Sequence, residues 1–246
     1  DLIYGLPLQT PARFARTVEA IIDLQPDRLS LFNYAHLPEQ YAPQRRINAN
    51  DLPPPAEKLA MLERSIHLLT DAGYRYIGVD HFALPDDELA MAQEDGSLQR
   101  NFQGYTTHGH CDLVGLGVSA ISQIGDLYCQ NTSDIEQYQY QLDQHQLATA
   151  RGLRCKQDDH IRRTVIQSLI CDFELSFTKI ESEHDIEFRQ YFAEAWPMLE
   201  QMAADGMIEI TESHLLIQPA GRLLVRSICM LFDHYLPEQV SQASRA

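Results

Sequence analysis

The chain has 246 residues, 44% of them hydrophobic and 22% charged, which is the composition of a soluble globular protein with one large domain or somewhat more. The formal net charge of −16 counts against a general nucleic-acid surface, which needs an excess of Lys and Arg. No run approaches the roughly 18 apolar residues that a membrane span needs, and no signal pattern opens the chain. We therefore expect a cytoplasmic protein.

The cysteines favour a reducing compartment. There are five, an odd number, and no two of them form a C-x-x-C pair. This pattern is typical of reduced thiols and counts against a disulfide framework or a zinc knuckle.

The first part of the chain alternates strands and helices. Residues 1–7 (DLIYGLP) are predicted to be a buried strand that runs into a glycine turn. Because a domain rarely opens on a core strand and residue 1 is Asp, we expect an upstream part in a longer protein. Thr10 and Pro11 are typical of a helix start. Residues 28–34 (RLSLFNY) form the next strand, which should pair in parallel with the first through a right-handed crossover.

A long loop with five prolines spans residues 35–55. Loops of that length are uncommon unless they are functional, and ligands bind at the carboxyl ends of strands in parallel α/β folds. A helix over residues 56–72, ended by Gly73, precedes a third strand at residues 74–79 and a short helix at residues 86–94.

Residues 101–126 (NFQGYTTHGHCDLVGLGVSAISQIGD) are predicted to be the wall of a ligand site. A polar, aromatic loop, NFQGY, lies next to an apolar run at residues 112–117 that is too short for a helix and suits a buried strand. Small residues after it would allow close approach to the backbone. The alternative is an ordinary aromatic loop packed on a sheet.

The rest of the chain is predicted to be mainly helical. A Gln-rich helix at residues 133–150 leads to helices at residues 157–170 and 184–204, the second interrupted before Pro197. A hairpin around Ser213 and a last helix at residues 219–236 complete a pattern that resembles a winged-helix module. Residues 151–246 hold ten Lys and Arg against fifteen Asp and Glu, so a structural or substrate-covering cap is favoured over a DNA reader. We place the domains at residues 1–150 and 151–246.

Residue chemistry alone does not name a reaction. His108, His110 and Cys111 suggest a metal cluster, but alternate residues of a strand point to opposite faces and no second ligand pair is near. Asp80 and His81 are either an acid–base pair or a strand terminus with local hydrogen bonds. No nucleotide-binding or nucleophile motif is present.

Five sequence blocks, DLIYGLPLQT, PDRLSLFNYAHLP, GVDHFALPDDELA, NFQGYTT and DLVGLGVSAIS, resemble the oxygen-independent coproporphyrinogen III oxidases. These are radical S-adenosylmethionine enzymes of haem biosynthesis. The resemblance continues to about residue 236 through RRTVIQSLIC and GRLLVRSICMLFD. It implies an α/β fold: the C-terminal part of a partial (β/α) barrel, followed by a mainly helical, winged-helix-like domain.

The resemblance implies oxidative decarboxylation of two propionates of coproporphyrinogen III to vinyl groups, with S-adenosylmethionine and a [4Fe–4S] cluster as cofactors. By motif, the S-adenosylmethionine contacts would be Asp1, Phe32, Ala35, Gln103 and Ile121. An apolar side chain such as Ile121 suits adenine, and a carboxylate can accept hydrogen bonds from a ribose or an ammonium group. Phe32 and Ile121 would also be core residues of any such barrel.

The proposed substrate has four carboxylates, so an acidic protein needs local cations to hold it. Arg45, Arg46 and Arg100 lie in loops that are expected to face the cavity, although surface solvation explains them as well. The resemblance also implies an electron donor, which the sequence does not identify. We expect a monomer that binds no nucleic acid. A haem-binding chaperone of the related branch is the alternative, and the NFQGYTT loop favours the oxidase.

The family's cluster ligands come from a C-x-x-x-C-x-x-C loop, and no cysteines of this chain have that spacing. We therefore predict that the purified chain, reconstituted with iron and sulfide, holds no cluster and turns over no substrate. Iron and sulfide analysis with a turnover assay checks this, and stoichiometric iron would contradict it.

Overall fold

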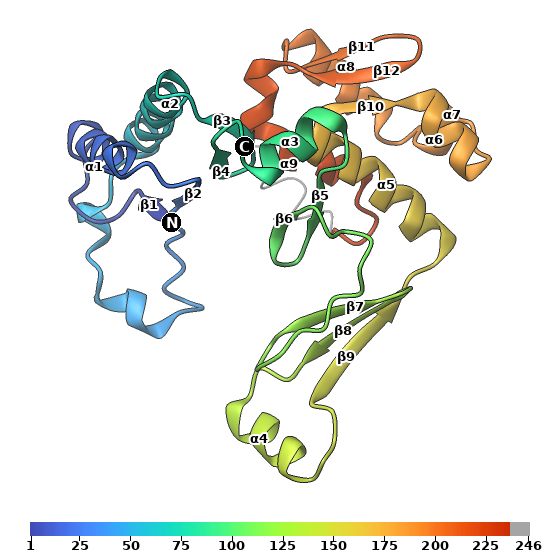
Figure 1. Ribbon diagram of the computed structural model, residues 1–246, viewed down its shortest axis with the longest axis horizontal. Helices are drawn as coiled ribbons and strands as arrows, with labels where there is room; N and C mark the ends of the chain where they lie inside the picture. Colours follow the sequence, from blue (N-terminus) through green and yellow to red (C-terminus); the bar gives the residue numbers. More distant parts are fainter. Residues whose placement is uncertain (237–246) are drawn as a thin grey trace. The chain divides into compact units, whose positions relative to one another are not determined.

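The computed structural model describes residues 1–236 and has two compact units, Asp1–Ser97 and Leu98–Ala246 (Figure 1). Each unit is described by itself. The predicted boundary between residues 150 and 151 falls inside strand β9 (Thr149–Arg154), whereas the contacts divide the chain after Ser97. The predicted α/β class is confirmed, since both units contain strands as well as helices.

The first unit contains a four-stranded sheet in the order β1-β2-β4-β3. Its strands are β1 (Leu2–Tyr4), β2 (Arg28–Asn33), β3 (Arg75–Gly78) and β4 (His81–Ala83). Strands β1 and β2 are parallel, as predicted for a strand–helix–strand unit. Strand β4 is antiparallel to both β2 and β3. The sheet is therefore mixed, and the third predicted strand turns back as a hairpin before it joins the sheet.

Three helices follow the expected capping chemistry. Helix α1 (Pro11–Leu24) begins after Thr10, whose hydroxyl accepts the Arg13 N–H. Helix α2 (Pro55–Asp71) ends just before Gly73, whose φ of +92° suits a glycine after a helix. Helix α3 (Glu88–Asp95) is capped by the Asp87 carboxylate. The predicted loop between β2 and α2 is confirmed and contains two 3₁₀ turns, η1 (Ala42–Arg46) and η2 (Ala49–Asp51).

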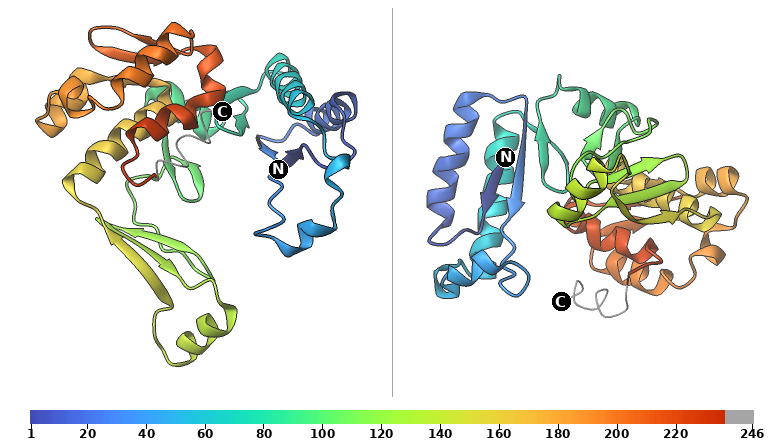
Figure 2. Two further views of the ribbon diagram at one scale, coloured as in Figure 1. Left: turned by 180° about the vertical axis from the view of Figure 1, so that it is seen from behind. Right: turned by 90° about the horizontal axis from the view of Figure 1, so that it is seen from below.

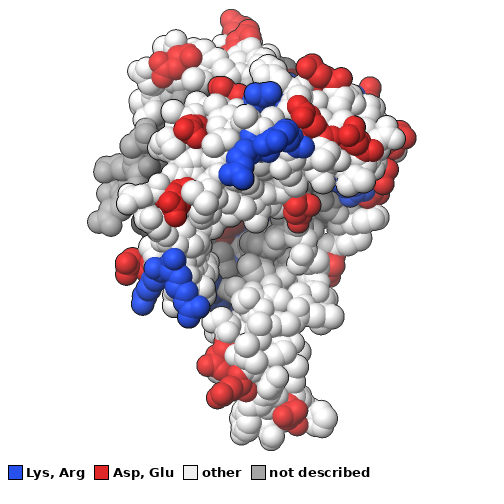
Figure 3. Space-filling model, turned by 90° about the vertical axis from the view of Figure 1, so that its left-hand side faces the viewer, with Lys and Arg blue, Asp and Glu red and all other residues white. Residues whose placement is uncertain are grey.

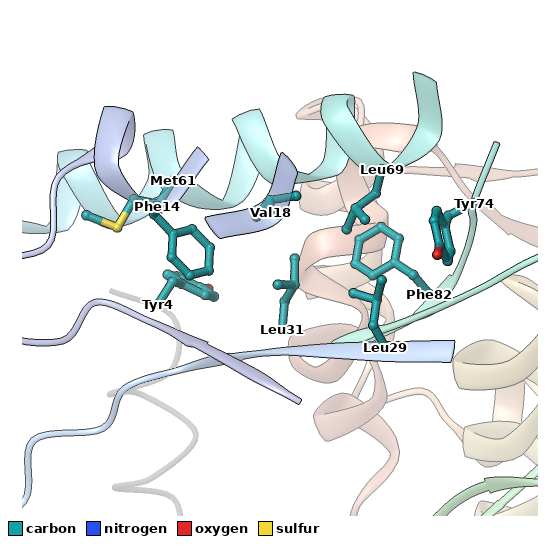
Figure 4. Close-up of a cluster of buried hydrophobic side chains, with 9 residues drawn as sticks. All are labelled: Tyr4, Phe14, Val18, Leu29, Leu31, Met61, Leu69, Tyr74 and Phe82. Atoms are coloured by element: carbon teal, nitrogen blue, oxygen red, sulfur yellow. The ribbon is translucent and has the colours of Figure 1, made fainter. Parts of the chain in front are cut away.

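Helices α1 and α2 cover one face of this sheet. Nine buried side chains fill the space between the helices and the sheet (Figure 4). Val18 of α1, Leu69 of α2 and Leu31 of β2 are at most 1% exposed. Alternation along a strand sends neighbouring side chains to the opposite face. On that face Ile3 is 45% and Phe32 is 37% exposed. The sheet is thus closed by helices on one side and open within its own unit on the other.

The second unit begins with a hairpin and a three-stranded sheet. The hairpin joins β5 (Gln99–Asn101) to β6 (Gly104–Thr106). The sheet has the order β7-β8-β9, with β7 at Ile121–Ile124 and β8 at Leu127–Asn131. Helix α4 (Ile135–Asp143) links β8 to β9 and lies at one end of the sheet (Figures 1 and 2).

Two predictions in this region were wrong. Residues 112–117 form no buried strand: Leu113 makes a single bridge to Gln123, and Val114 and Leu116 are 64% and 87% exposed. The predicted helix at residues 133–150 is shorter, because α4 ends at Asp143 and the chain then enters β9. Hydrophobic periodicity is too weak in the short apolar run to predict a buried strand, and too weak in the Gln-rich segment to predict where its helix ends.

The rest of the second unit has winged-helix topology, as predicted. Its small sheet has the order β10-β12-β11. The prediction missed β10 and the helix at Phe177–His184, and it placed the start of a helix at His184, where the structure ends one. The interruption predicted before Pro197 is confirmed, since one helix ends at Tyr191 and the next begins at Trp196. The last predicted helix is instead a 3₁₀ turn, one short helix and another 3₁₀ turn. The elements are α5 (Gln157–Asp172), β10 (Glu174–Ser176), α6 (Phe177–His184), α7 (Phe188–Tyr191), α8 (Trp196–Ala204), β11 (Ile208–Ile210), β12 (His214–Ile217), η3 (Pro219–Leu224), α9 (Val225–Cys229) and η4 (Met230–Phe232).

The surface is acidic. On the face shown in Figure 3, Asp and Glu are spread over the surface, whereas Lys and Arg form a few separate groups. Within residues 1–236, no helix combines the length and the apolar character needed to cross a membrane.

We predict that Leu31→Ala lowers the free energy of unfolding by about 2–5 kcal/mol, because it leaves a cavity in the core of the first unit. Leu24→Ala is the matched control, since Leu24 is 76% exposed at the end of α1 and its loss should change stability by less than about 0.5 kcal/mol. Urea denaturation of both variants measures the difference, and equal midpoints would contradict the assigned core.

Candidate functional site

The open face of the first sheet brings together side chains from three strands. Ile3 of β1 is the register partner of Phe32 of β2, so both lie side by side on this face. Asp1 stands two residues before Ile3, directly ahead of β1, and is exposed. The ring of His81 on β4 meets Phe32 edge-on, with centroids 6.3 Å apart and an interplanar angle of 89°. This face offers apolar surface beside a carboxylate and an imidazole.

Asp80 and His81 were predicted to follow the end of one strand. In the structure they instead lie where a hairpin turn leads into the next strand. Asp80 is in the turn between β3 and β4, where its carbonyl accepts the Leu31 N–H at 2.8 Å. His81 is already inside β4, opposite Ser30. The turn is tight because Gly78 and Val79 have φ angles of +145° and +53°. The acid–base role of this pair stays a hypothesis.

The carboxyl edge of β1 and β2 is held by backbone contacts. The Tyr34 N–H donates to the Tyr4 carbonyl at 2.8 Å, and Lys58 Nζ donates to the Tyr34 carbonyl at 3.2 Å. Gly5 is required here, because its φ is +84° and a Cβ would lie 3.0 Å from Lys58 Cε. The edge is therefore fixed by α2 before the long loop begins.

Ala35, Arg45 and Arg46 all belong to that loop and are exposed. The Ala35 carbonyl accepts from Gln44 Nε2 at 3.1 Å, which folds the loop back on itself. Arg45 Nε donates to the Pro38 carbonyl at 3.0 Å, so part of its donor capacity serves the loop. These contacts shape the loop at the carboxyl edge of the parallel pair.

In the second unit, Ile121 and the NFQGY segment meet at one cavity. Phe102, in the turn of the β5–β6 hairpin, packs edge-on against Tyr128 of β8, with centroids 5.2 Å apart and an interplanar angle of 89°. A cavity of about 270 Å³ beside this pair is lined by Ile121, Phe102, Tyr128 and residues of β8 and β9. The two ends of the predicted ligand wall are thus brought together, although the strand predicted at residues 112–117 does not form.

The hairpin is fixed to α5 from the other side. The Tyr105 hydroxyl donates to the Ile170 carbonyl at 2.9 Å. The Gln167 side chain accepts the Arg100 N–H through Oε1 and donates to the Arg100 carbonyl from Nε2. The Arg100 guanidinium lies 4.6 Å from the centroid of the Tyr105 ring. Burial raises the pKa of the Cys229 thiol to about 12, and the charge of Arg100 opposes that rise. Arg100 therefore sits against α5 beside buried, protonated thiols.

Gln103 faces different surroundings from Ile121. It is exposed, its N–H donates to Asn101 Oδ1 at 2.8 Å, and it lines a separate cavity of about 380 Å³ with His108 and Cys111. In the part of the chain that the structure describes, no group of three His, Cys, Asp or Glu side chains is placed to hold a metal ion.

Residues 112–120 fold back on β7 through specific hydrogen bonds. The Gly115 N–H donates to Ser122 Oγ at 2.9 Å, and Asn131 Nδ2 donates to the Gly117 carbonyl at 2.9 Å. A Cβ on Gly115 would lie 2.6 Å from the Ile121 carbonyl oxygen. This close approach holds the backbone at Ile121, where the 270 Å³ cavity begins.

Comparison with known proteins gives several strong matches. The family described as the HemN C-terminal domain matches residues 155–224. An oxygen-independent coproporphyrinogen III oxidase of Pseudomonas aeruginosa is 71% identical, over 96% of this chain and 52% of its own length. The corresponding enzyme of Thermostichus vulcanus is 43% identical, over 97% of this chain and 74% of its own length.

The chain belongs to the oxygen-independent coproporphyrinogen III oxidase family.

A solved structure extends this likeness to three dimensions. The coproporphyrinogen III oxidase of Escherichia coli, described as a radical SAM enzyme, matches with a TM-score of 0.93 and 54% identity. The match covers 96% of this chain and 54% of the other. This family member therefore spans about half the length of the first curated relatives it matches. The family resemblance read from the sequence blocks is confirmed.

The expected oxidase site residues divide between the two units. Asp1, Phe32 and Ala35 lie in the first unit, and Gln103 and Ile121 lie in the second. Their roles stay predictions, as do those of Arg45, Arg46 and Arg100. Sequence reasoning missed Tyr128 and Arg163, which line cavities beside Phe102. The only signal for Arg163 was its place in the block RRTVIQSLIC, and Tyr128 lies outside the blocks that carry the resemblance. Nothing local places β8 or α5 next to the NFQGY hairpin.

We predict that Tyr105→Phe loosens the NFQGY hairpin by removing its hydrogen bond to α5, at a cost of about 1 kcal/mol in the free energy of unfolding. Tyr140→Phe is the matched control, because Tyr140 is 66% exposed on α4. Denaturation and amide hydrogen exchange at residues 99–106 measure the effect. Unchanged exchange in Tyr105→Phe would contradict the anchoring role.

Proposed function

We propose that the protein containing this chain converts coproporphyrinogen III to protoporphyrinogen IX by oxidative decarboxylation of two propionate side chains. The observation that carries the proposal is the 71% identity to a named oxidase over 96% of this chain. The likeness spans both units, so it includes the open sheet face as well as the NFQGY hairpin.

S-adenosylmethionine fits the donor set of the predicted site. Asp1 supplies a carboxylate that can accept hydrogen bonds from ribose hydroxyls or from the ammonium group. Ile121 in the second unit offers apolar surface that suits an adenine ring, and Phe32 in the first unit offers apolar surface beside Ala35; both are partly exposed. Ala35 is small enough to let a second cofactor approach the start of the loop, and Gln103 offers an amide. Cofactor binding is the part of the chemistry that these residues perform.

The [4Fe–4S] cluster does not fit the residues of this chain. Within residues 1–236 no three candidate ligands gather in one place. In radical S-adenosylmethionine enzymes such a cluster supplies the electron that cleaves the cofactor. The proposed roles of the residues of this chain are therefore binding, orienting and shielding.

The substrate would be held through its carboxylates. Arg45 and Arg46 lie in the loop at the carboxyl edge of β1 and β2, where an anion can reach them. Arg100 is packed against Tyr105, which makes it the more structural of the three. A carboxylate paired with Arg45 or Arg46 gains only about 0.2–1 kcal/mol, because both side chains are exposed and water screens the pair.

Other functions have weaker support. The relatives that match along nearly the entire chain are named as oxidases, which favours the oxidase over a haem-binding chaperone. A DNA reader needs a basic helix ahead of the hairpin, and α8 (WPMLEQMAA) carries neither Lys nor Arg. We keep the proposals of a monomeric, cytoplasmic protein that binds no nucleic acid and draws electrons from a separate donor.

The full-length protein tests the proposed activity directly. Incubated anaerobically with S-adenosylmethionine, a reductant and coproporphyrinogen III, it should form protoporphyrinogen IX and carbon dioxide in a ratio of one to two. Tight stoichiometric haem binding without turnover would support the chaperone instead.

We predict that Asp1→Asn in the full-length protein weakens S-adenosylmethionine binding about tenfold, because an amide replaces the charged acceptor. Asp23→Asn is the control, since Asp23 is exposed at the end of α1 and makes the same change in charge. Equilibrium dialysis with labelled cofactor and the rate of 5′-deoxyadenosine formation measure the effect. Equal affinities of the two variants would remove Asp1 from the site.

A further inference from the structure

A second cavity in the same unit is also lined by the Phe102–Tyr128 pair. Its volume is about 450 Å³, which is within the range of roughly 300–1,000 Å³ that small-molecule sites occupy. Phe102, Tyr128 and Leu153 line both this cavity and the one at Ile121. A ligand in one cavity therefore lies next to a ligand in the other.

Two arginines of α5 line this cavity, and their surroundings differ. Arg162 is engaged: its Nε donates to the Asp158 carboxylate at 2.8 Å and its Nη1 donates to the Phe232 carbonyl at 3.0 Å. Arg163 places its guanidinium 4.8 Å from the centroid of the Tyr128 ring and donates from Nη2 to Cys155 Sγ at 3.2 Å. Among residues 1–236 the structure gives Arg163 no ion pair with a carboxylate.

Arg163 makes no direct ion pair among residues 1–236, although the carboxylates of Asp159 and Asp233 also line the cavity. Burial raises the pKa of the Cys155 thiol, so this thiol is neutral at ordinary pH. Asp159 also lines the cavity, but its carboxylate caps the start of α5 by accepting the Lys156 N–H at 2.7 Å. A guanidinium held over an aromatic face keeps donors free for a planar anion, because its five N–H groups form a rigid fork.

Part of the remaining lining suits an apolar ring, and the polar side chains Gln167, Asp233, His234 and Tyr235 complete the wall. Phe102 is 54% and Leu153 is 42% exposed, and both line the cavity with Tyr128 and Ile166. Aromatic edges and aliphatic side chains recognise a ring by contact, and the arginine fixes which end of the ligand enters first. The combination selects a ring that carries a carboxylate on a short arm.

We propose that this cavity binds one propionate-bearing pyrrole ring of the porphyrinogen, with Arg163 pairing the carboxylate and Phe102 and Tyr128 contacting the ring. The proposal rests on the oxidase function proposed above. It places that ring next to the cavity at Ile121, where the adenine of S-adenosylmethionine is expected. In this proposal Arg163 replaces Arg100 as the main carboxylate contact of this unit, because Arg100 packs against Tyr105.

Titration of the 246-residue chain with coproporphyrin III, the stable oxidised form of the proposed substrate, tests the site by porphyrin fluorescence. Arg163→Gln should weaken binding about tenfold or more, because a charged hydrogen bond is lost. Arg163→Lys should give a smaller loss, since it keeps the charge without the fork. Arg154→Gln is the control: it makes the same change in charge on an exposed residue of β9.

The tetramethyl ester of the porphyrin, titrated in the same buffer, should bind more weakly than the acid and should not distinguish the variants. Circular dichroism and thermal melting verify that each variant is folded. No binding by the unaltered chain, or equal affinities for Arg163→Gln and Arg154→Gln, would overturn the site.

The full-length protein separates this inference from the proposed function. With turnover present, Arg163→Gln should raise KM for coproporphyrinogen III about tenfold with a smaller change in kcat. Turnover with an unchanged KM overturns the role of Arg163 and keeps the oxidase. Absence of turnover, with binding still dependent on Arg163, overturns the oxidase and keeps the carboxylate site.

Discussion

Burial of a single face of the β1–β2–β4–β3 sheet is the constraint on which the first unit depends. Because side chains alternate along each strand, packing Tyr4 and Leu31 under α1 and α2 sends Ile3 and Phe32 to the opposite face. The strand register that buries the core therefore also exposes an apolar surface on the opposite face. Slipping either strand by one residue would exchange core and open face, so the proposed cofactor contacts cannot vary independently of the packing.

The second unit is organised by the edge-on contact between Phe102 and Tyr128. It joins the β5–β6 hairpin to the β7–β8–β9 sheet, while Tyr105 holds the same hairpin to α5. Two cavities share this contact in their lining, one with Ile121 and the other with Arg163. The winged-helix region thus contributes α5 as one wall of the cavity at Arg163. This use of the fold agrees with an acidic surface that lacks the basic helix of a DNA reader.

Elements with strong local signals were predictable. Capping residues, prolines and glycines placed α1, α2 and α3 within a few residues, because these signals act through neighbouring backbone groups. The run Leu113 to Val118 had a strand-like composition and was predicted to be buried, yet Leu116 is 87% exposed. Its backbone is occupied by bonds to Ser122 and Asn131 instead, and no pattern within six residues encodes those partners.

The sequence by itself determined the family, the strand–helix–strand start, the acidic surface and the winged-helix order of the last part. Each of these depends on residue identity or on local periodicity. Only the tertiary structure decided that His81 lies inside a strand, that Phe102 meets Tyr128, and that Arg163 faces a cavity without a carboxylate partner among residues 1–236. Those arrangements join segments that are distant along the chain. Their energies come from side-chain packing and desolvation between these segments, which local sequence does not record.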